Sequence, residues 1–279
     1  MTSVKSVPLK LGLVGYGNMG RALIQGVVQK PSLRERFSPI VFESWEPGAK
    51  AARDSGLEVA PSAAHLAAAS DIVILAVKPN QVGGVLDEIA PSLAKEGSGK
   101  LVLSIAAGIT LDFMQKRLGG RCPVARVMPN TLALVGEGYF ALCFGDGVAD
   151  PLRDAVRDLL KSLGSLAELE ESKFNAFTAL SGSGPAYVFH FMESLAEAGV
   201  SVGLDRATSR SIALSLVRGA AAMAERTGEH PAVLREQVSS PAGTTIAAIN
   251  HLDRTGVRGH LVDAVIAATA RGREMEEEA

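Results

Sequence analysis

Short apolar runs of strand length alternate with stretches of helical length through the N-terminal half of the chain. The apolar runs lie at Leu11–Val14, Ile40–Glu43, Asp71–Val77, Lys100–Ile105, Val124–Met128 and Tyr139–Phe144. Amphipathic or alanine-rich stretches lie between them at Arg21–Val28, Ala49–Ser55, Ser62–Ala69, Val85–Ala94 and Pro151–Leu163. This alternation predicts an α/β, Rossmann-like fold with a doubly wound, mostly parallel sheet.

The pattern changes near Gly164–Leu169, and from Glu171 onward the apolar residues recur with a helical period. We therefore predict a dinucleotide-binding domain at residues 1–165 and an all-α domain at residues 166–279. Its long helices carry too few polar residues to cover every face, so we expect another subunit to cover them and predict an obligate homo-oligomer. The acidic end, Glu274–Glu278, is expected to fray. The predicted long helices lie at Pro185–Val200, Asp205–Thr227 and Val257–Glu278.

Three glycines follow the first predicted strand with the spacing Gly15-x-Gly17-x-x-Gly20, and a helix-like stretch follows them. Strand, glycine turn and helix in this order are typical of a dinucleotide-binding crossover. Gly15 allows the tight turn, Gly17 lets the backbone approach a pyrophosphate, and Gly20 lets helix and strand pack closely. The helix start offers unpaired N–H groups to the phosphates.

Further candidate residues lie where the other predicted strands end, at the edge where open α/β sheets bind ligands. Glu43 follows Gly20 by about 20 residues, where a carboxylate binds the adenosine ribose of NAD; the alternative is a solvated acid at a strand end. Lys78-Pro79 places a cation at this edge. Three roles are open for the Lys78 side chain: it binds a phosphate, makes a structural contact or donates a proton. The small residues Ala106-Ala107-Gly108 would let a nicotinamide ring or a phosphate approach the backbone.

A hydroxyl-rich turn, Ser239-Ser240-Pro241-Ala242-Gly243-Thr244-Thr245, precedes a short predicted helix at Ile246–Leu252. Helix N–H groups and hydroxyls that donate to one point would bind a carboxylate. The alternative is an ordinary helix N-cap, a common use of Ser and Thr. Four hydroxyls in seven residues favour the carboxylate site.

Composition and charge narrow the classes of function. A formal net charge of -2 gives no reason to expect nucleic acid or an anionic membrane as a partner. No apolar run approaches the roughly 20 residues that span a bilayer, and residues 1–10 lack the apolar stretch of a signal peptide. Cys122 and Cys143 lie far apart, and the histidines are scattered, so we expect no metal site and no disulfide framework. A cytoplasmic location is the expected default.

Taken together, these segments resemble Δ1-pyrroline-5-carboxylate reductase, from about Lys10 to Met275. The most specific motifs are Leu180-Ser181-Gly182-Ser183-Gly184-Pro185-Ala186-Tyr187 and Val238–Thr245, with support from Ala76–Pro79 and Met128–Thr131. The resemblance implies an N-terminal Rossmann domain, a helical C-terminal domain, homodimers interlocked through it, and in some members a decamer, a ring of dimers. It also implies hydride transfer from NADPH or NADH to the cyclic imine pyrroline-5-carboxylate, giving L-proline in the last step of proline biosynthesis.

The resemblance also implies roles for individual residues. The residues expected to bind the cofactor are Gly15, Tyr16, Gly17, Asn18, Met19, Gly20, Glu43, Ala76, Val77, Lys78, Pro79, Ile105, Ala106, Ala107 and Asn130. Those expected to bind substrate are Glu171, Ser240, Gly243, Thr244 and Thr245. For catalysis, we expect the Thr245 hydroxyl, or a water that it holds, to hydrogen-bond the ring nitrogen; Lys78 is the charged alternative.

Two positions depart from the family pattern. Ala242 replaces the first glycine of Pro-Gly-Gly, so this residue is expected not to need a positive φ. Glu43 stands where many members have a small or basic residue, and an acid there would repel the 2′-phosphate of NADPH. Two other functions stay open at this point. One is a reductase of a β-hydroxyacid or of another imine; the absence of a clear catalytic lysine argues against the hydroxyacid version. The other is a non-catalytic nucleotide sensor, which would not need the turn at Ser239–Thr245.

Overall fold

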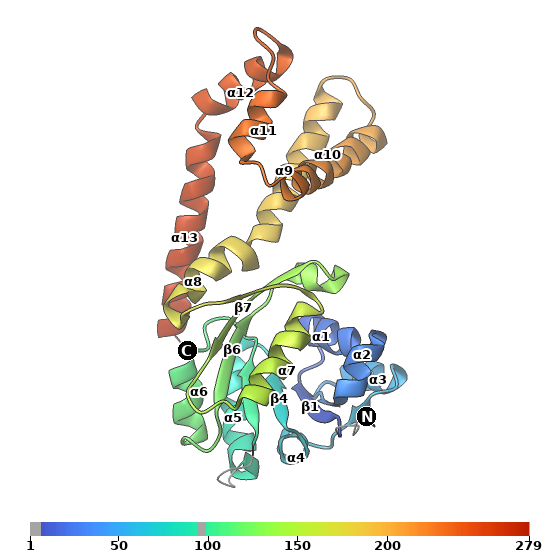
Figure 1. Ribbon diagram of the computed structural model, residues 1–279, viewed down its shortest axis with the longest axis vertical. Helices are drawn as coiled ribbons and strands as arrows, with labels where there is room; N and C mark the ends of the chain where they lie inside the picture. The colour runs from blue at the N-terminus through green and yellow to red at the C-terminus, as the bar shows by residue number, and fades with distance from the viewer. Residues whose placement is uncertain (1–6, 94–98, 279) are drawn as a thin grey trace, which may run out of the picture. The chain divides into compact units, whose positions relative to one another are not determined.

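The structure is a computed structural model that describes residues 7–93 and 99–278 (Figure 1). The chain forms two compact units. The first comprises Met1–Gly182 and Thr269–Ala279, and the second comprises Ser183–Ala268. The first ten residues and the helix predicted at Val85–Ala94 lie partly outside the described residues.

The first unit contains an eight-stranded sheet in the order β3-β2-β1-β4-β5-β6-β7-β8. All neighbouring strands are parallel except β6 and β7, which confirms the predicted doubly wound, mostly parallel sheet. The chain order reverses at β1, which pairs with β2 on one side and β4 on the other. The strands are β1 (Leu9–Val14), β2 (Phe37–Phe42), β3 (Glu58–Val59), β4 (Ile72–Leu75), β5 (Leu101–Ser104), β6 (Val124–Met128), β7 (Gly138–Phe144) and β8 (Gly164–Glu168).

Helices cover both faces of the sheet, and the central strands are apolar on both sides for this reason. In β4, Ile72 and Ile74 join a core cluster with residues of α1 and α7, whereas Val73 and Leu75 join a second cluster with α4, α5 and α6. The continuous apolar run that predicted this strand therefore reflects burial on two faces. The helices are α1 (Asn18–Gln29), α2 (Pro31–Arg36), α3 (Glu46–Asp54), α4 (Ala63–Ala69), α5 (Pro79–Ile89), α6 (Leu111–Leu118) and α7 (Asp150–Lys161).

The first unit continues beyond the sheet through short helical segments and ends with the last turns of the chain. The segments after β8 are the 3-10 helix η3 (Glu171–Lys173), the short helix α8 (Phe174–Phe177) and a π-helical turn, η4 (Thr178–Gly182). Two further 3-10 helices lie before strands, η1 (Ala90–Leu93) before β5 and η2 (Thr131–Val135) before β7. The boundary predicted between residues 165 and 166 falls inside β8, which pairs with β7 along its whole length. The structure therefore moves the boundary to Gly182 and returns residues from Thr269 onward to the first unit.

The second unit is entirely helical. Its elements are α9 (Gly184–Ser201), α10 (Arg206–Thr227), α11 (Pro231–Gln237), α12 (Thr244–Arg254) and most of α13 (Val257–Glu277). Helices α9 and α10 approach closely at Gly199, where a Cβ atom would lie 2.6 Å from Oγ of Ser209. No helix in the described part of the chain is long and apolar enough to cross a membrane.

The second unit has almost no core of its own. Within Ser183–Ala268, all of which the structure describes, only Pro185, Ser209 and Ala213 are buried. Large apolar side chains are exposed along its helices, and they include Val188, Phe189, Phe191, Ile212, Leu214, Leu216, Met223, Val238, Leu261, Val262 and Ile266. These are the apolar faces that led to the prediction of an oligomer.

Two local predictions were wrong. Helix α5 begins at Pro79 rather than Val85, because proline suits the first turn of a helix, where its missing N–H is not needed. The acidic end of the chain does not fray: α13 continues to Glu277, and the Glu276 carboxylate pairs with the buried side chain of Arg126.

Candidate active site

The glycine turn between β1 and α1 has the geometry that its spacing predicts. Gly15 has a φ of 99°, and a Cβ atom on it would lie 2.8 Å from the Ala76 carbonyl oxygen. On Gly20, a Cβ atom would lie 2.4 Å from the Gly15 carbonyl oxygen. Gly17 is the N-cap of α1, no side chain caps this helix, and a Cβ atom on Gly17 would meet nothing within 4 Å. The turn thus leaves open space in front of free helix N–H groups, which fits a pyrophosphate.

The segments that follow β1, β4 and β5 lie side by side at the carboxyl edge of the sheet. Gly15 N–H donates to the Phe42 carbonyl at 2.8 Å, and Ala76 N–H donates to the Val14 carbonyl at 2.8 Å. Ile105 N–H donates to the Leu75 carbonyl at 3.1 Å. The edge therefore brings together the predicted cofactor residues from Gly15–Gly20, Ala76–Pro79 and Ile105–Ala107, next to the point where the strand order reverses, as expected for a dinucleotide site.

Glu43 lies at the same edge, directly after β2, but it is not a freely solvated acid. Its Oε2 accepts a hydrogen bond from Tyr16 N–H at 2.7 Å, and its Oε1 accepts one from Trp45 N–H at 2.9 Å. The carboxylate is half-buried and fixed against the glycine turn. A negative charge is consequently held beside the residues expected to bind the cofactor.

Lys78 and Pro79 begin α5 rather than ending a strand. Lys78 is the N-cap and Pro79 the first residue of this helix, and Lys78 N–H donates to Oε1 of Gln81 at 3.3 Å. The Lys78 side chain is exposed, and it forms no ion pair within the described residues. It therefore presents a free cation at the carboxyl edge of the sheet.

Asn130 and Glu171, also predicted site residues, are occupied by contacts within the first unit. Asn130 is 6% exposed; its Nδ2 donates to Oγ of Ser181 at 3.2 Å, and its Oδ1 accepts from Tyr139 N–H at 3.2 Å. Glu171 Oε1 accepts from Leu111 N–H at 2.7 Å and from Arg126 at 3.1 Å. Both side chains therefore stabilise the fold where they lie, and their proposed ligand contacts stay predictions.

The hydroxyl-rich turn Ser239–Thr245 belongs to the second unit and leads into α12. Gly243 is the N-cap of this helix, no side chain caps it, and a Cβ atom on Gly243 would lie 2.3 Å from Oγ of Ser240. In the described part of the chain, no hydrogen bond involves the hydroxyls of Ser240, Thr244 or Thr245. The turn is therefore not an ordinary side-chain N-cap, and its donors remain free for a ligand.

The expectation for Ala242 was wrong. It has a φ of 55° and is the only non-glycine residue with a positive φ among the described residues. Gly243 N–H donates to the Ser240 carbonyl at 3.1 Å, which makes Ser240–Gly243 a β-turn with Pro241 second and Ala242 third. Proline at the second position and a positive φ at the third are the features of a type II turn. The turn therefore imposes the left-handed conformation on Ala242, although this conformation is unfavourable for a residue that has a Cβ atom.

The sequence reasoning missed a group of residues around Arg126, in the middle of β6. This side chain is only 3% exposed and pairs with both Glu171 and Glu276. A single arginine in the otherwise apolar run Val124–Met128 was the available signal, because a buried charge requires a partner. The partners themselves lie far away in the sequence.

Comparisons with known proteins agree with this architecture. The family model for pyrroline-5-carboxylate reductase dimerisation matches residues 171–275, and the model for NADP oxidoreductase, coenzyme F420-dependent, matches residues 10–108. Pyrroline-5-carboxylate reductase from Glycine max is 40% identical over 95% of this chain and 95% of its own length. The enzyme of the same name from Corynebacterium melassecola is 38% identical over 95% of this chain and 98% of its own.

Solved structures give the same result. Plasmodium falciparum pyrroline carboxylate reductase with NADP bound has a TM-score of 0.85 and 32% identity, covering 96% of this chain and 98% of that one. The pyrroline-5-carboxylate reductase of Coxiella burnetii has a TM-score of 0.87 and 31% identity, covering 96% of this chain and 99% of that one.

The fold and the glycine turn define an NAD(P)H-dependent oxidoreductase with a Rossmann-like unit and a helical unit. With relatives of this identity over nearly its whole length, the chain belongs to the pyrroline-5-carboxylate reductase family. The family, the enzyme class and the reductase function predicted from the sequence motifs are thereby confirmed, and the dimerisation model supports an oligomer.

The glycine turn yields a prediction that separates binding from stability. We expect Gly17→Ala to leave the unfolding midpoint unchanged and to raise the dissociation constant for NADPH at least about tenfold, or about 1.4 kcal/mol, because the added methyl group enters the pyrophosphate space. Gly20→Ala should lower the free energy of unfolding by about 1–3 kcal/mol through overpacking against the Gly15 carbonyl.

Fluorescence titration and urea denaturation measure the two effects. Gly84→Ala is the matched control, because Gly84 also has open space around it but lies within α5. Unchanged NADPH affinity in Gly17→Ala would show that the pyrophosphate does not approach this residue.

Proposed function

We propose that the protein reduces the cyclic imine of 1-pyrroline-5-carboxylate to L-proline with a hydride from NAD(P)H. The observation that carries this proposal is a pair of helix starts with a glycine N-cap and no side-chain cap, one in each unit. The first, at Gly17, suits the phosphates of a dinucleotide, and the second, at Gly243, suits a carboxylate flanked by free hydroxyls. Membership of the reductase family supports the assignment.

The residues of the first unit would hold the cofactor at the carboxyl edge of the sheet. Gly15–Gly20 would bind the pyrophosphate, and Ala76–Pro79 would line its path, with Lys78 as a cation for the phosphates. Ile105–Ala107 would lie along the nicotinamide, and Asn130 would lie nearby. When bound, NAD(P)H supplies the hydride, and the protein contributes orientation and electrostatics.

The residues of the second unit would hold the substrate. Oγ of Ser240 and the N–H groups at Gly243 and Thr244 would bind the carboxylate, and Glu171 of the first unit is the remaining predicted contact. The Thr245 hydroxyl would hydrogen-bond the ring nitrogen, which gains a proton as the imine carbon gains a hydride. The C=N double bond becomes a single bond, and the product is a secondary amine.

Substitution of Thr245 tests this assignment. We expect Thr245→Ala to lower kcat with pyrroline-5-carboxylate about 100-fold, because a positioned proton donor contributes about that much. The measurement is the steady-state oxidation of NADH and of NADPH, side by side, with pyrroline-5-carboxylate as substrate.

Thr255→Ala is the matched control, since Oγ1 of Thr255 is bonded to the His251 carbonyl at the other end of α12. It should keep the wild-type rate. A wild-type rate in Thr245→Ala would show that the Thr245 hydroxyl is not the proton donor. If the wild-type protein binds NADPH but does not reduce pyrroline-5-carboxylate, a nucleotide sensor is the better assignment.

The fixed carboxylate of Glu43 supports a preference for NADH over NADPH. In NAD-binding sites an acid at this position accepts hydrogen bonds from the ribose hydroxyls, whereas a 2′-phosphate would bring a second negative charge to the same place. The basic side chains on α3 do not offset this charge: Arg53 pairs with Glu46, and Lys50 pairs with Asp54.

Neutralising Glu43 tests the preference. We expect Glu43→Gln to lower the dissociation constant for NADPH relative to NADH about fivefold, which corresponds to about 1 kcal/mol of repulsion removed at a solvated distance of about 4 Å. Side-by-side titrations and assays with both cofactors measure it, and Asp54→Asn at the far end of α3 controls for net charge. A wild-type protein with a marked preference for NADPH would contradict this interpretation of Glu43.

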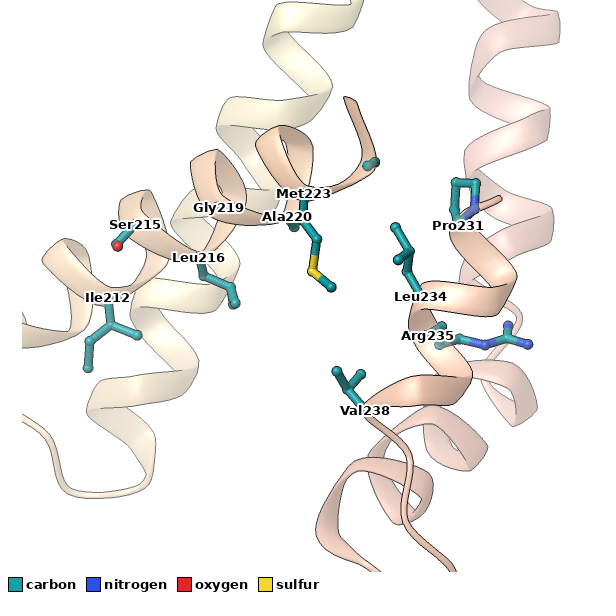
Figure 2. A pocket seen from close by; sticks show the side chains of 11 residues that line it. Ile212, Ser215, Leu216, Gly219, Ala220, Met223, Pro231, Leu234, Arg235 and Val238 are labelled. Carbon is teal, nitrogen blue, oxygen red and sulfur yellow. The ribbon is translucent and has the colours of Figure 1, made fainter. Parts of the chain in front are cut away.

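We further propose that the assembly is a homodimer formed through the second unit. An apolar groove of about 710 Å³ lies between α10 and α11, and Figure 2 shows Leu216 and Met223 facing Leu234 and Val238 across it. A unit with so few buried residues requires cover, and a second copy of the same helices offers a complementary apolar face. A decamer built of five such dimers is the larger assembly that the family resemblance implies.

A charge in the groove tests the assembly. We expect Leu216→Asp to convert the oligomer to a monomer and to abolish activity, because a carboxylate cannot be buried unpaired in an apolar interface. Size-exclusion chromatography with light scattering gives the mass and separates dimer from decamer. Val202→Asp, an equivalent change at a residue that is 81% exposed and outside the groove, should leave the mass unchanged. An unaltered oligomer in Leu216→Asp would exclude the groove as the interface.

A cytoplasmic location is also proposed. Its support is that Cys122 and Cys143 are both free, as is usual in a reducing compartment. Burial raises the pKa of the Cys122 thiol to about 11, which keeps this thiol protonated and unreactive near neutral pH.

A further inference from the structure

Arg126 is the most deeply buried cation that the described residues show in an ion pair. Its Nη1 lies 3.1 Å from Glu171 Oε1, and its Nη2 lies 2.8 Å from Glu276 Oε1. The guanidinium also lies over the Phe174 ring, 4.7 Å from its centroid. Asn175 Nδ2 completes the group with a hydrogen bond of 2.8 Å to Glu276 Oε2. We call Arg126, Glu171, Asn175 and Glu276 the clasp.

The clasp joins the two chain segments that connect the units. The second unit, Ser183–Ala268, has one connection before Ser183 and one after Ala268. Glu171 and Asn175 lie in the outgoing segment, just before the π-helical turn Thr178–Gly182, and Glu276 lies in the returning segment, at the end of α13. One buried guanidinium therefore anchors both connections to the same strand of the sheet.

The clasp also contacts the turn that follows β5. Arg126 pairs in register with Ser104, the last residue of β5, and Glu171 accepts a hydrogen bond from Leu111, the first residue of α6. Between them, Gly108 has a φ of 77°, and a Cβ atom on it would lie 3.3 Å from the Met275 carbonyl oxygen. The end of α13 is thus packed against the loop expected to lie along the nicotinamide.

We propose that Glu276 is a positioning residue: through Arg126, it holds the end of α13 and residues 171–175 against β6, and so fixes the loop at residues 106–108 that is expected to lie along the nicotinamide. This inference rests on the proposed function, in which the nicotinamide lies along this loop. The clasp and this loop lie in the same unit, and the close approach of Gly108 to the Met275 carbonyl transmits the position of α13 to the loop. Hydride transfer is sensitive to such positioning because reacting atoms must approach to about 3–3.5 Å.

The ion pair is suited to this task because breaking it is costly. Arg126 carries one positive charge and faces two carboxylates, and both of them are mostly shielded from solvent. Loss of Glu276 leaves the guanidinium with Glu171 alone and leaves Asn175 without its acceptor. The returning segment then loses both of the polar contacts that Glu276 makes, one with β6 and one with the outgoing segment.

Comparison of Glu276→Ala with Glu277→Ala in the full-length protein tests the proposal. The two variants lose the same charge one residue apart on the same helix, but Glu277 is exposed and has no ion pair within the described residues. We expect Glu276→Ala to lower kcat/KM for pyrroline-5-carboxylate at least fivefold, with the dissociation constant for NADPH within twofold of wild type. Hydrogen exchange should become faster in residues 171–182 and 269–277 together. Glu277→Ala should match wild type in all three measurements.

Asn175→Ala, which leaves the ion pair intact, should give a smaller change of the same kind and serves as the second variant. Equal kcat/KM in Glu276→Ala and Glu277→Ala would overturn the positioning role, as would a loss of NADPH affinity as large as the loss of kcat/KM. If the wild-type protein does not reduce pyrroline-5-carboxylate, the proposed function is wrong. Hydrogen exchange then tests by itself whether Glu276 holds the segments of the clasp in place. Unchanged exchange in Glu276→Ala would then overturn this role.

Discussion

The helical unit cannot bury its own apolar side chains, and the rest of the molecule depends on this constraint. Its helices expose Phe189, Leu216 and Ile266, so it is completed only by cover from outside. The turn proposed to bind the substrate lies on this unit, whereas the glycine turn lies on a sheet with two full core clusters. The cofactor edge therefore lies on a unit with a core of its own, whereas the turn proposed to bind the substrate lies on a unit that has almost none.

The sheet was predictable because the two-sided burial of its central strands leaves a strong signal. Runs such as Ile72–Leu75 are apolar at every position, and each residue has a core to enter. Strand β8 was missed because it lies at the edge of the sheet, where Gly164–Glu168 is partly exposed and mixes polar with apolar residues. The beginning of α5 was missed because Lys78-Pro79 has the composition of a turn, although proline equally begins a helix.

Some features of the candidate site are determined by neighbouring residues in the sequence and were predictable, whereas others depend on distant residues and were not. The glycine turn follows from spacing within ten residues, and its geometry agrees with the reasons given for each glycine. The conformation of Ala242 was predicted from the residue type alone, whereas the hydrogen bond from Gly243 to Ser240 and the fixed φ of Pro241 decide it. The partners of Arg126 were beyond reach, because Glu276 lies 150 residues away and nothing local specifies the pairing.

That separation has a consequence for how the protein is made. Synthesis proceeds from the N-terminus, and domains generally fold as their residues emerge from the ribosome. Here the sheet of the first unit is complete in sequence at Glu168, yet Arg126 obtains its second carboxylate only when Glu276 has been added. The nascent Rossmann-like unit must therefore hold a half-paired buried cation while the whole helical unit is translated. Its last ion pair therefore closes only after the helical unit has been synthesised.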